Sequence, residues 1–367
     1  MEISMRILVA VTDYPSPESV ALMYVHTRNK IYAENGFEVS VLNFSASKGY
    51  VFEGIRVFSL SEVQQSDESY DLLVCHAANI RNHYRFLKRA HHRFAHIVFF
   101  FHGHEVLRIN RCYPDPYPYM GGNSFFYRMF WACYDTLKLF LWRKTLPKLA
   151  GKSRFIFVSR DFFGEFKRYT KLNEEKLSFH TEIIHNSVGR IFEQQCYDPS
   201  GPKEYDFISI RPYMDQTKYG VDLVSSLARA NPDLKFLVVG KGRFFQENPP
   251  PENLDWHDGT LFPEQIPQWF CRARGFLNPT RADTQGVMTC EAATFGIPTI
   301  TSDLPICHEI CDSFSNVAFI DNKNTQIDLR PILEELERRP FEKSERYFIK
   351  NTVLREVELF RSLAEEK

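Results

Sequence analysis

The sequence of 367 residues lacks the features that mark several special classes of protein. Its formal net charge is −1, so its overall electrostatics give no indication of nucleic acid binding. Its eight cysteines contain no CxxC spacing, and several fall in predicted strands or helices, so we expect reduced thiols rather than disulfides. The chain also has no tandem short repeat and no low-complexity tail, so it is expected to fold into ordinary globular domains.

Long apolar runs are missing as well. No stretch has the length and purity of a transmembrane helix. At the start of the chain, acidic Glu2 precedes Arg6 and the first apolar run ends by Thr12, which is not the pattern of a secretory signal peptide. We therefore expect a cytoplasmic protein that at most lies on the inner face of a membrane.

The chain does contain regularly alternating secondary-structure signals. Strand-like apolar runs alternate with amphipathic segments, which predicts an α/β fold with parallel sheets. A polar stretch with Pro and Gly, residues 189–204, separates two such series and reads as a linker. We expect two Rossmann-like domains that face each other across a ligand-binding cleft. The predicted strands are residues 6–12, 38–43, 55–59, 71–76, 96–102 and 154–159 in the first series, and 206–210, 235–239, 275–278, 298–301 and 317–320 in the second.

The most informative stretch is residues 278–310, which reads as a strand end, a tight turn, a helix and a second strand. Gly286 is expected to open the helix and Gly296 to close it as a left-handed cap. A glycine at a helix start lets the backbone approach a ligand closely, and the free N–H groups there suit an anion. Glu291 lies just over one turn inside the helix and can face the same cleft as Asp283.

This pattern resembles the donor-binding signature of retaining GT-B glycosyltransferases of the family 4 type. The resemblance is carried by Asp283 and Glu291, eight residues apart, followed by a short helix and Gly296-Ile297-Pro298. It departs from the family at Asp283, where a glutamate is more usual. The alternative is another Rossmann-like strand–turn–helix unit with a chance acidic pair.

The resemblance implies a domain layout. Residues 1–190 would form an N-terminal acceptor domain, and residues 203–344 a C-terminal domain that binds a nucleotide sugar. A C-terminal helix at about 346–367 would pack back on the first domain.

The donor site implied by the resemblance contains two cations. Arg211 ends a predicted strand, and Lys218 precedes a glycine and a helix, as the family expects. The diphosphate leaving group gains negative charge as the glycosidic bond breaks, and fixed cations stabilise that charge. The remaining donor groups implied by the resemblance are Thr260 and Leu261 at the base, Glu291 at the ribose, and Asp283 with the backbone of Gly286, Val287 and Met288 at the sugar and phosphates.

A histidine follows a very apolar strand in the first half. The family commonly has a histidine beside the transferred sugar, and His102 is the better match, with His104 second. A zinc site formed by His102, His104 and Glu105 is an alternative, but no further ligand cluster is evident. Our expectation is that no metal is bound and that Arg211 and Lys218 supply the positive charge.

Residues 106–160 combine basic and aromatic side chains. The stretch has ten Lys or Arg against two Asp, together with runs such as Phe125-Phe126-Tyr127. On a long helix this composition suits an anionic membrane surface. The alternative is a core helix with an aromatic stripe and a solvated basic face. The Tyr-, Pro- and Gly-rich residues 112–123 are a candidate acceptor lid or sugar-stacking surface.

By resemblance, the chain is a hexosyltransferase-type enzyme (EC 2.4) that acts with retention of configuration and requires no cofactor. Its donor would be a nucleotide-diphosphate sugar, with a UDP-sugar favoured and a GDP-sugar second. Its acceptor would be a glycan or a lipid-linked sugar in surface polysaccharide or glycolipid assembly. The alternatives are a sugar-nucleotide epimerase or hydrolase of the same fold, and a catalytically silent nucleotide-sugar-binding scaffold.

Overall fold

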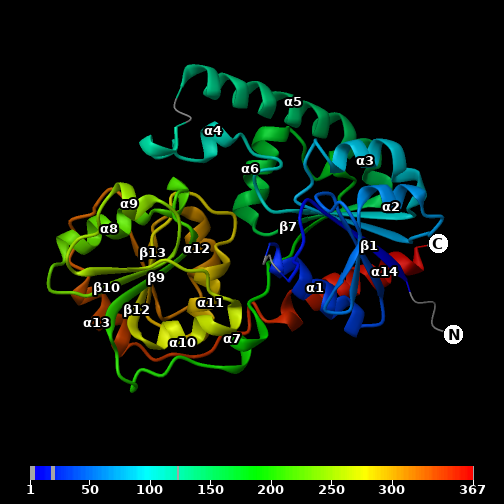
Figure 1. Cartoon of the computed structure of the whole chain (residues 1–367). Coiled ribbons are helices and arrows are strands. Elements are labelled where there is room, and N and C mark those ends of the chain that lie inside the picture. Colours follow the sequence, from blue (N-terminus) through cyan, green and yellow to red (C-terminus); the bar gives the residue numbers. More distant parts are fainter. Residues whose placement is uncertain (1–4, 18–20, 122–123, 367) are drawn as a thin grey trace. The chain divides into compact units, whose positions relative to one another are not determined.

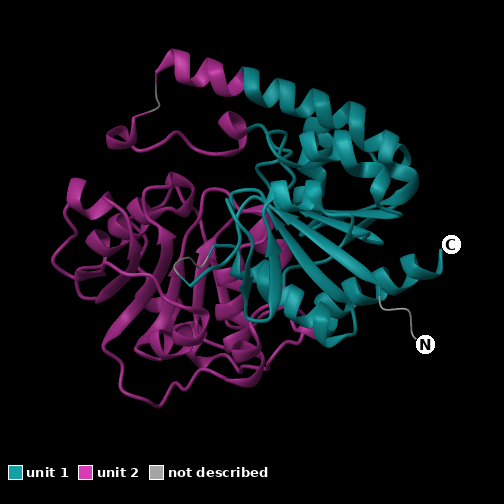
Figure 2. Ribbon diagram, turned by 45° about the vertical axis from the view of Figure 1, so that its right-hand side comes forward, with its two compact units in different colours: residues 1–108, 133–186, 350–367 teal, residues 109–132, 187–349 magenta. Residues whose placement is uncertain are grey.

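The computed structural model describes residues 5–17, 21–121 and 124–366. It contains two compact units, which Figure 2 distinguishes by colour. Unit 1 comprises residues 1–108, 133–186 and 350–367, and unit 2 comprises residues 109–132 and 187–349. No helix in the described ranges combines the length and the apolar character needed to cross a membrane.

Unit 1 is built on an eight-stranded sheet in the order β3-β4-β2-β1-β5-β6-β7-β8. All of its strand pairs are parallel except the hairpin of β3 and β4. The strands are β1 (Arg6–Val11), β2 (Glu38–Asn43), β3 (Tyr50–Phe52), β4 (Ile55–Phe58), β5 (Leu72–His76), β6 (His96–Phe101), β7 (Ser153–Phe157) and β8 (Thr181–Ile183). Its helices are α1 (Met23–Glu34), α2 (Leu60–Gln65), α3 (His83–Ala90), α6 (Arg160–Thr170) and α14 (Val353–Glu365).

The C-terminal helix α14 belongs to unit 1 and is fixed there by a buried charge pair. Arg28 of α1 donates from Nε to Glu356 of α14 at 3.2 Å and from Nη2 to Asn186 at 2.9 Å. Tyr32 donates a further hydrogen bond to Glu356. Both charged side chains are almost fully buried, so each charge depends on the other.

Unit 2 is built on a six-stranded parallel sheet in the order β11-β10-β9-β12-β13-β14. Strands β9, β10, β12 and β13 are labelled in Figure 1. Helices α8, α9 and α13 contribute to the core on one face, and α7, α10, α11 and α12 to the core on the other. The strands are β9 (Tyr205–Tyr213), β10 (Phe236–Lys241), β11 (Leu254–His257), β12 (Ala273–Asn278), β13 (Thr299–Ser302) and β14 (Val317–Ile320). The helices are α4 (Ile109–Cys112), α7 (Arg190–Gln194), α8 (Val221–Ala230), α9 (Phe244–Glu247), α10 (Ile266–Cys271), α11 (Val287–Phe295), α12 (Pro305–Cys311) and α13 (Arg330–Arg338).

A segment from the first half of the chain is part of unit 2. We call residues 109–121 the strap; it leads toward the 25-residue helix α5 (Phe125–Leu149), whose first turns, through residue 132, also belong to unit 2. Tyr117 of the strap is buried in the core cluster beside α8 and α9, and its hydroxyl donates to Asp222 at 2.7 Å. Tyr119 donates to Asp215 at 2.8 Å. Residues 109–132 were expected in the N-terminal domain, but the structure groups them with unit 2.

The expected α/β fold with parallel sheets is confirmed, and the predicted strands are all present to within a few residues. Three short strands were not predicted: β3, β8 and β11. Each lies at the edge of its sheet, where three or four residues with mixed exposure give little periodic signal. The C-terminal helix begins at Val353 rather than near residue 346, and a 3₁₀ turn at Ile349–Asn351 precedes it.

Gly240 of β10 permits a close backbone approach that positions the end of β9. A Cβ atom built at Gly240 would lie 1.9 Å from the carbonyl oxygen of Arg211, and the β9–β10 register shifts at this point. We expect Gly240→Ala to destabilise the protein by roughly 1–3 kcal/mol, because the strands must move apart. In Gly164→Ala, within α6, the new methyl meets nothing within 4 Å, so this control should be stabilised by about 0.5–1 kcal/mol. Urea denaturation of both variants measures the difference, and equal midpoints would contradict this account.

Candidate functional site

The candidate site lies at the point of unit 2 where the strand order reverses. β9 lies between β10 and β12. From β9 the chain adds β10 and β11 on one side of the sheet, and it then adds β12, β13 and β14 on the other side. In open parallel sheets, ligands bind outside the carboxyl ends of the strands at such a switch point. Arg211 lies near the end of β9, Lys218 follows it in the loop to α8, and Asp283 follows β12.

Arg211 is a buried cation with incomplete partnering. Its side chain is 3% exposed, and its Nη2 donates to the carbonyl oxygen of Pro279 at 2.8 Å. Its Nε is buried and has no hydrogen-bond partner among the described residues. Burial lowers the pKa of Arg211 to about 10, against the opposing effect of the Asp283 charge. The guanidinium is therefore a desolvated cation that an anion would stabilise.

Lys218 is held by its backbone while its ammonium group lies among aromatic rings. Its carbonyl oxygen accepts hydrogen bonds from the Arg281 amide at 2.8 Å and the Thr280 hydroxyl at 2.9 Å. Its Nζ lies 4.9 Å from the ring centre of Tyr113 and 4.8 Å from that of Tyr219. Desolvation lowers the pKa of Lys218, and the Asp283 charge partly opposes this. Asp283 thus interacts electrostatically with both Arg211 and Lys218.

Asp283 caps the turn that leads into α11. Its Oδ1 accepts from the backbone N–H groups of Thr284 at 2.7 Å, Gln285 at 3.2 Å and Gly286 at 2.8 Å. The N–H of Gly286, expected to be free for a ligand, is therefore already used. The N–H groups of Val287 and Met288 belong to the first helical turn, where an α-helix supplies no internal acceptor. The other Asp283 oxygen, Oδ2, accepts no hydrogen bond from the part of the chain that the structure describes.

The helix α11 has the two glycine ends that the sequence predicted. Gly286 precedes it with φ of 66° and Gly296 follows it with φ of 99°, both in the left-handed region. A Cβ at Gly286 would lie 3.2 Å from Asp283 Oδ2, so a side chain there would crowd the capping carboxylate.

Glu291 is a buried carboxyl on α11. It is 9% exposed, and within the described ranges no hydrogen bond or salt bridge reaches its side chain. Desolvation raises the pKa of Glu291 to about 8. A ligand that donates hydrogen bonds, such as a vicinal diol, would relieve this cost.

Thr260 and Leu261 lie in the loop between β11 and α10. Thr260 is exposed, and Leu261 packs, like Met288, against the core cluster that contains α11. Neither residue shares a hydrogen bond with the other predicted donor groups in the described structure. Their proposed role at the base would rest on the loop backbone.

Sequence reasoning missed a network that positions the Lys218 loop. Arg281 donates two hydrogen bonds to the Asp222 carboxylate, at 2.7 and 2.6 Å, and a third to the Thr217 carbonyl at 3.0 Å. Asp222 also accepts from Tyr117 of the strap. In the sequence, Arg281 and Asp222 are visible only as charged residues near the two loops that contain the predicted donor groups. Their pairing depends on the fold.

His102 lies in unit 1, directly after β6. Its Nε2 is 3.0 Å from Nδ1 of His76, and desolvation lowers its pKa to about 3, so the ring is neutral at physiological pH. Glu105 accepts hydrogen bonds from the backbone N–H groups of His102 and Gly103 and thereby shapes this turn. No three His, Cys, Asp or Glu side chains in the described ranges are arranged to hold a metal ion, so His102, His104 and Glu105 do not form the zinc site considered above. None of the eight cysteines, all of which lie in the described ranges, forms a disulfide.

Comparison with known proteins bears on both units. Residues 209–329 match the family model described as glycosyl transferases group 1. No curated protein matches the chain by sequence. Among solved structures, a sucrose-phosphate synthase from Thermosynechococcus elongatus has a TM-score of 0.75 at 13% identity, with 99% of this chain and 100% of that chain covered. HepE from Anabaena, in complex with UDP and glucose, has a TM-score of 0.67 at 14% identity, with 98% and 100% covered. WaaG, a glycosyltransferase involved in lipopolysaccharide biosynthesis, has a TM-score of 0.60 at 15% identity, with 89% and 90% covered.

These similarities extend over nearly the whole chain, and the matched family segment contains the Arg211, Lys218, Asp283 and Glu291 positions. The chain is a glycosyltransferase with the GT-B fold, and its residues 209–329 form a group 1 glycosyltransferase domain. The predicted fold and enzyme class are thereby confirmed.

The raised pKa of Glu291 predicts a pH-dependent stability. The folded state retains a proton that the unfolded state releases above about pH 4.5, so stability falls as the pH rises from 4.5 through about 8. Glu291→Gln removes this titration, and its melting temperature should exceed that of wild type increasingly over this range, by the equivalent of a few kcal/mol at most. Exposed Glu252→Gln is the matched control and should follow wild type. A constant difference between Glu291→Gln and wild type from pH 5 to 8.5 would contradict the assignment.

Proposed function

We propose that the chain is a retaining glycosyltransferase that moves a sugar from a UDP-sugar, or alternatively a GDP-sugar, to a hydroxyl of a glycan or lipid-linked sugar. The observation that carries the proposal is the set of desolvated charged groups at the unit 2 switch point. Arg211 and Lys218 are cations without a bound carboxylate partner in the described structure, and Glu291 is a carboxyl without a donor. A nucleoside diphosphate would supply phosphate oxygens for the two cations and ribose hydroxyls for the carboxyl group.

In this proposal, each group has one role. Arg211 and Lys218 bind the diphosphate and stabilise the charge that develops on it as the bond to the sugar breaks. Glu291 accepts from the ribose hydroxyls, and the loop at Thr260 and Leu261 holds the base. Binding of the anion near the first turn of α11 adds the favourable N–H groups of Val287 and Met288.

The sugar would be held by the other carboxylate. Asp283 has one oxygen engaged by the backbone and the other available to sugar hydroxyls. His102 would lie beside the reacting carbon as a neutral ring, consistent with its low pKa. Retention would follow from attack on the same face that the diphosphate leaves, with a phosphate oxygen taking the proton of the acceptor hydroxyl. The similarity to HepE, which was solved with UDP and glucose, supports a uridine nucleotide donor.

The proposed acceptor and location draw on α5. Residues 124–130 are exposed all round, and Phe125 and Phe126 are 74% and 75% exposed. An apolar helix end beside a basic stretch is suited to an anionic membrane surface. The similarity to WaaG supports an acceptor in surface polysaccharide or glycolipid assembly. The enzyme would then act on the cytoplasmic face of a membrane as a peripheral protein.

The donor-site assignment is tested with Lys218→Ala. Loss of the ammonium removes one of the two diphosphate cations, so turnover of the preferred nucleotide sugar should fall by about 10²-fold or more. Lys235→Ala is the matched control, because Lys235 also lies over a tyrosine ring, 4.8 Å from the centre of Tyr205, but at the opposite end of the sheet. A thermal-shift screen of UDP, GDP, ADP and CDP identifies the base, and product analysis follows transfer.

Each outcome of this test is decisive. Wild-type turnover in Lys218→Ala would refute the role of this residue. Rapid release of free or epimerised sugar without an acceptor would identify a hydrolase or epimerase. No thermal shift with any nucleoside diphosphate at millimolar concentration would favour a silent scaffold.

Membrane binding predicts flotation of the full chain with anionic liposomes. Vesicles of phosphatidylglycerol and phosphatidylcholine should float the wild type at low salt and lose it as salt rises. Replacing Phe125, Phe126 and Phe130 together with Ser should abolish flotation. Phe179→Ser, which alters a side chain 73% exposed in unit 1, is the control and should float like wild type. Flotation that depends neither on lipid charge nor on the three Phe side chains would contradict membrane binding through this surface.

A further inference from the structure

Unit 2 contains a cavity beside Lys218 that the donor site does not use. It has a volume of about 430 Å³ and lies among the strap, the first turns of α5 and the loop after β9. This volume falls within the roughly 300–1,000 Å³ of small-molecule sites. Of the predicted donor groups, Lys218 alone lines it.

The cavity wall formed by the strap is fixed to unit 2. The Tyr117 and Tyr119 rings stack at 5.6 Å, and Tyr117 also packs on Phe244 at 5.0 Å. Their hydroxyls bind Asp222 and Asp215, as described above. At the other end of the strap, Asn110 donates to the Arg128 carbonyl at 2.9 Å and so joins α4 to the start of α5. The cavity is therefore largely preformed.

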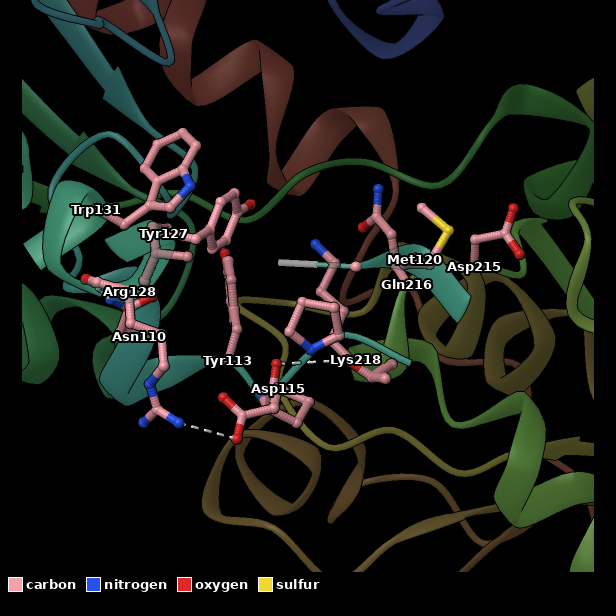
Figure 3. Close-up of a pocket in the computed structure, with 15 residues that line it drawn as sticks. Asn110, Tyr113, Asp115, Met120, Tyr127, Arg128, Trp131, Asp215, Gln216 and Lys218 are labelled. Atoms are coloured by element: carbon pink, nitrogen blue, oxygen red, sulfur yellow. Dashed lines mark hydrogen bonds and ion pairs between the residues drawn. The ribbon is translucent and has the colours of Figure 1, made fainter. Parts of the chain in front are cut away.

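Its lining combines aromatic faces with polar groups. In Figure 3, the rings of Tyr113, Tyr127 and Trp131 lie on one side of Lys218, and Gln216 and Asp215 on the other. The Tyr127 and Trp131 rings meet edge to face at 6.0 Å. A pyranose ring presents apolar C–H faces to aromatic rings and a rim of hydroxyls to amides and carboxylates, which is the complement of this lining.

The charges of the lining favour a neutral ligand. Arg128 is paired with Asp115 at 3.4 Å, and Asp215 accepts from Tyr119 and from the Arg243 amide. With Lys218 as the remaining cation and Asp215 as the remaining anion, the cavity carries no excess charge for a second phosphate. We propose that this cavity binds a sugar ring of the acceptor glycan.

This inference rests on the proposed function, because the shared Lys218 links the cavity to the donor diphosphate. The acceptor hydroxyl attacks the sugar carbon that is bonded to the diphosphate, and in a same-face reaction its proton passes to a diphosphate oxygen. One C–O bond to phosphate breaks as one C–O bond to the acceptor forms. An acceptor ring in a cavity that adjoins the diphosphate-binding lysine meets this requirement, and the strap then determines acceptor specificity.

The test measures saccharide binding to the full chain saturated with UDP. The probes are glucose, galactose, mannose, N-acetylglucosamine and their common α- and β-linked disaccharides, observed by saturation-transfer NMR. We expect at least one probe to bind wild type saturably, and Trp131→Ala to weaken it at least tenfold. Trp131→Phe, which keeps an aromatic face, should restore part of the affinity. Phe126→Ala, on the same helix but outside the cavity, should bind like wild type.

A replacement on the opposite wall of the cavity and a measurement of UDP binding separate the possible outcomes of this test. Gln216→Ala, across the cavity from Trp131, should also weaken the same probe, so the test does not depend on the folding of one variant. The UDP thermal shift of each variant reports on the donor site. If saccharide binding is unchanged in both variants, or if no probe binds while UDP still does, the cavity assignment is wrong and the donor-site assignment stands. A UDP shift lost with Trp131→Ala would show that the cavity holds the nucleotide. Trp131-dependent saccharide binding without any UDP shift would sustain the cavity and overturn the donor site.

Discussion

The burial of charged groups, which Asp283 relieves only in part, is the constraint on which the donor unit depends. Among the described residues, Arg211 and Lys218 are desolvated without a hydrogen-bonded carboxylate, and Glu291 is desolvated without a hydrogen-bond donor. The pKa values of Arg211 and Lys218 are lowered and that of Glu291 is raised, so the surroundings of each group disfavour its charged form. Such a site keeps its shape through backbone contacts rather than through its own charges. A bound ligand with complementary groups is therefore stabilised by electrostatic interactions that the free protein lacks.

The backbone contacts that hold this arrangement come from three separate parts of the chain. Gly240 lets β10 approach the Arg211 carbonyl, and the Pro279 carbonyl orients the guanidinium. The Lys218 carbonyl is fixed by the loop after β12. Arg281 and Asp222 then tie that loop to the start of α8 and, through Tyr117, to the strap. One bonded network therefore positions both the donor cations and one wall of the neighbouring cavity.

The features predicted from sequence were those that local chemistry determines. Buried strands have nearly continuous apolar runs, and the helix α11 has glycines at both ends, so these elements were found in place. The edge strands β3, β8 and β11 lacked such runs. The three hydrogen bonds to Asp283 depend on the turn geometry, and no residue pattern announces them. The site roles of Arg211, Lys218, Asp283, Glu291 and His102 remain predictions. The contact of Tyr117 with Asp222 joins residues 105 positions apart, so sequence periodicity carries no information about it.

The discontinuous composition of the two units also constrains how the protein is made. Tyr117 leaves the ribosome 105 residues before its partner Asp222, a delay of about 5 to 20 s at ordinary rates of synthesis. Arg28 precedes Glu356 by 328 residues, so this buried pair can form only after residue 356 has been synthesised. Neither unit can complete its core while the nascent chain is half made. The aromatic strap and the first sheet must therefore remain unaggregated through most of translation.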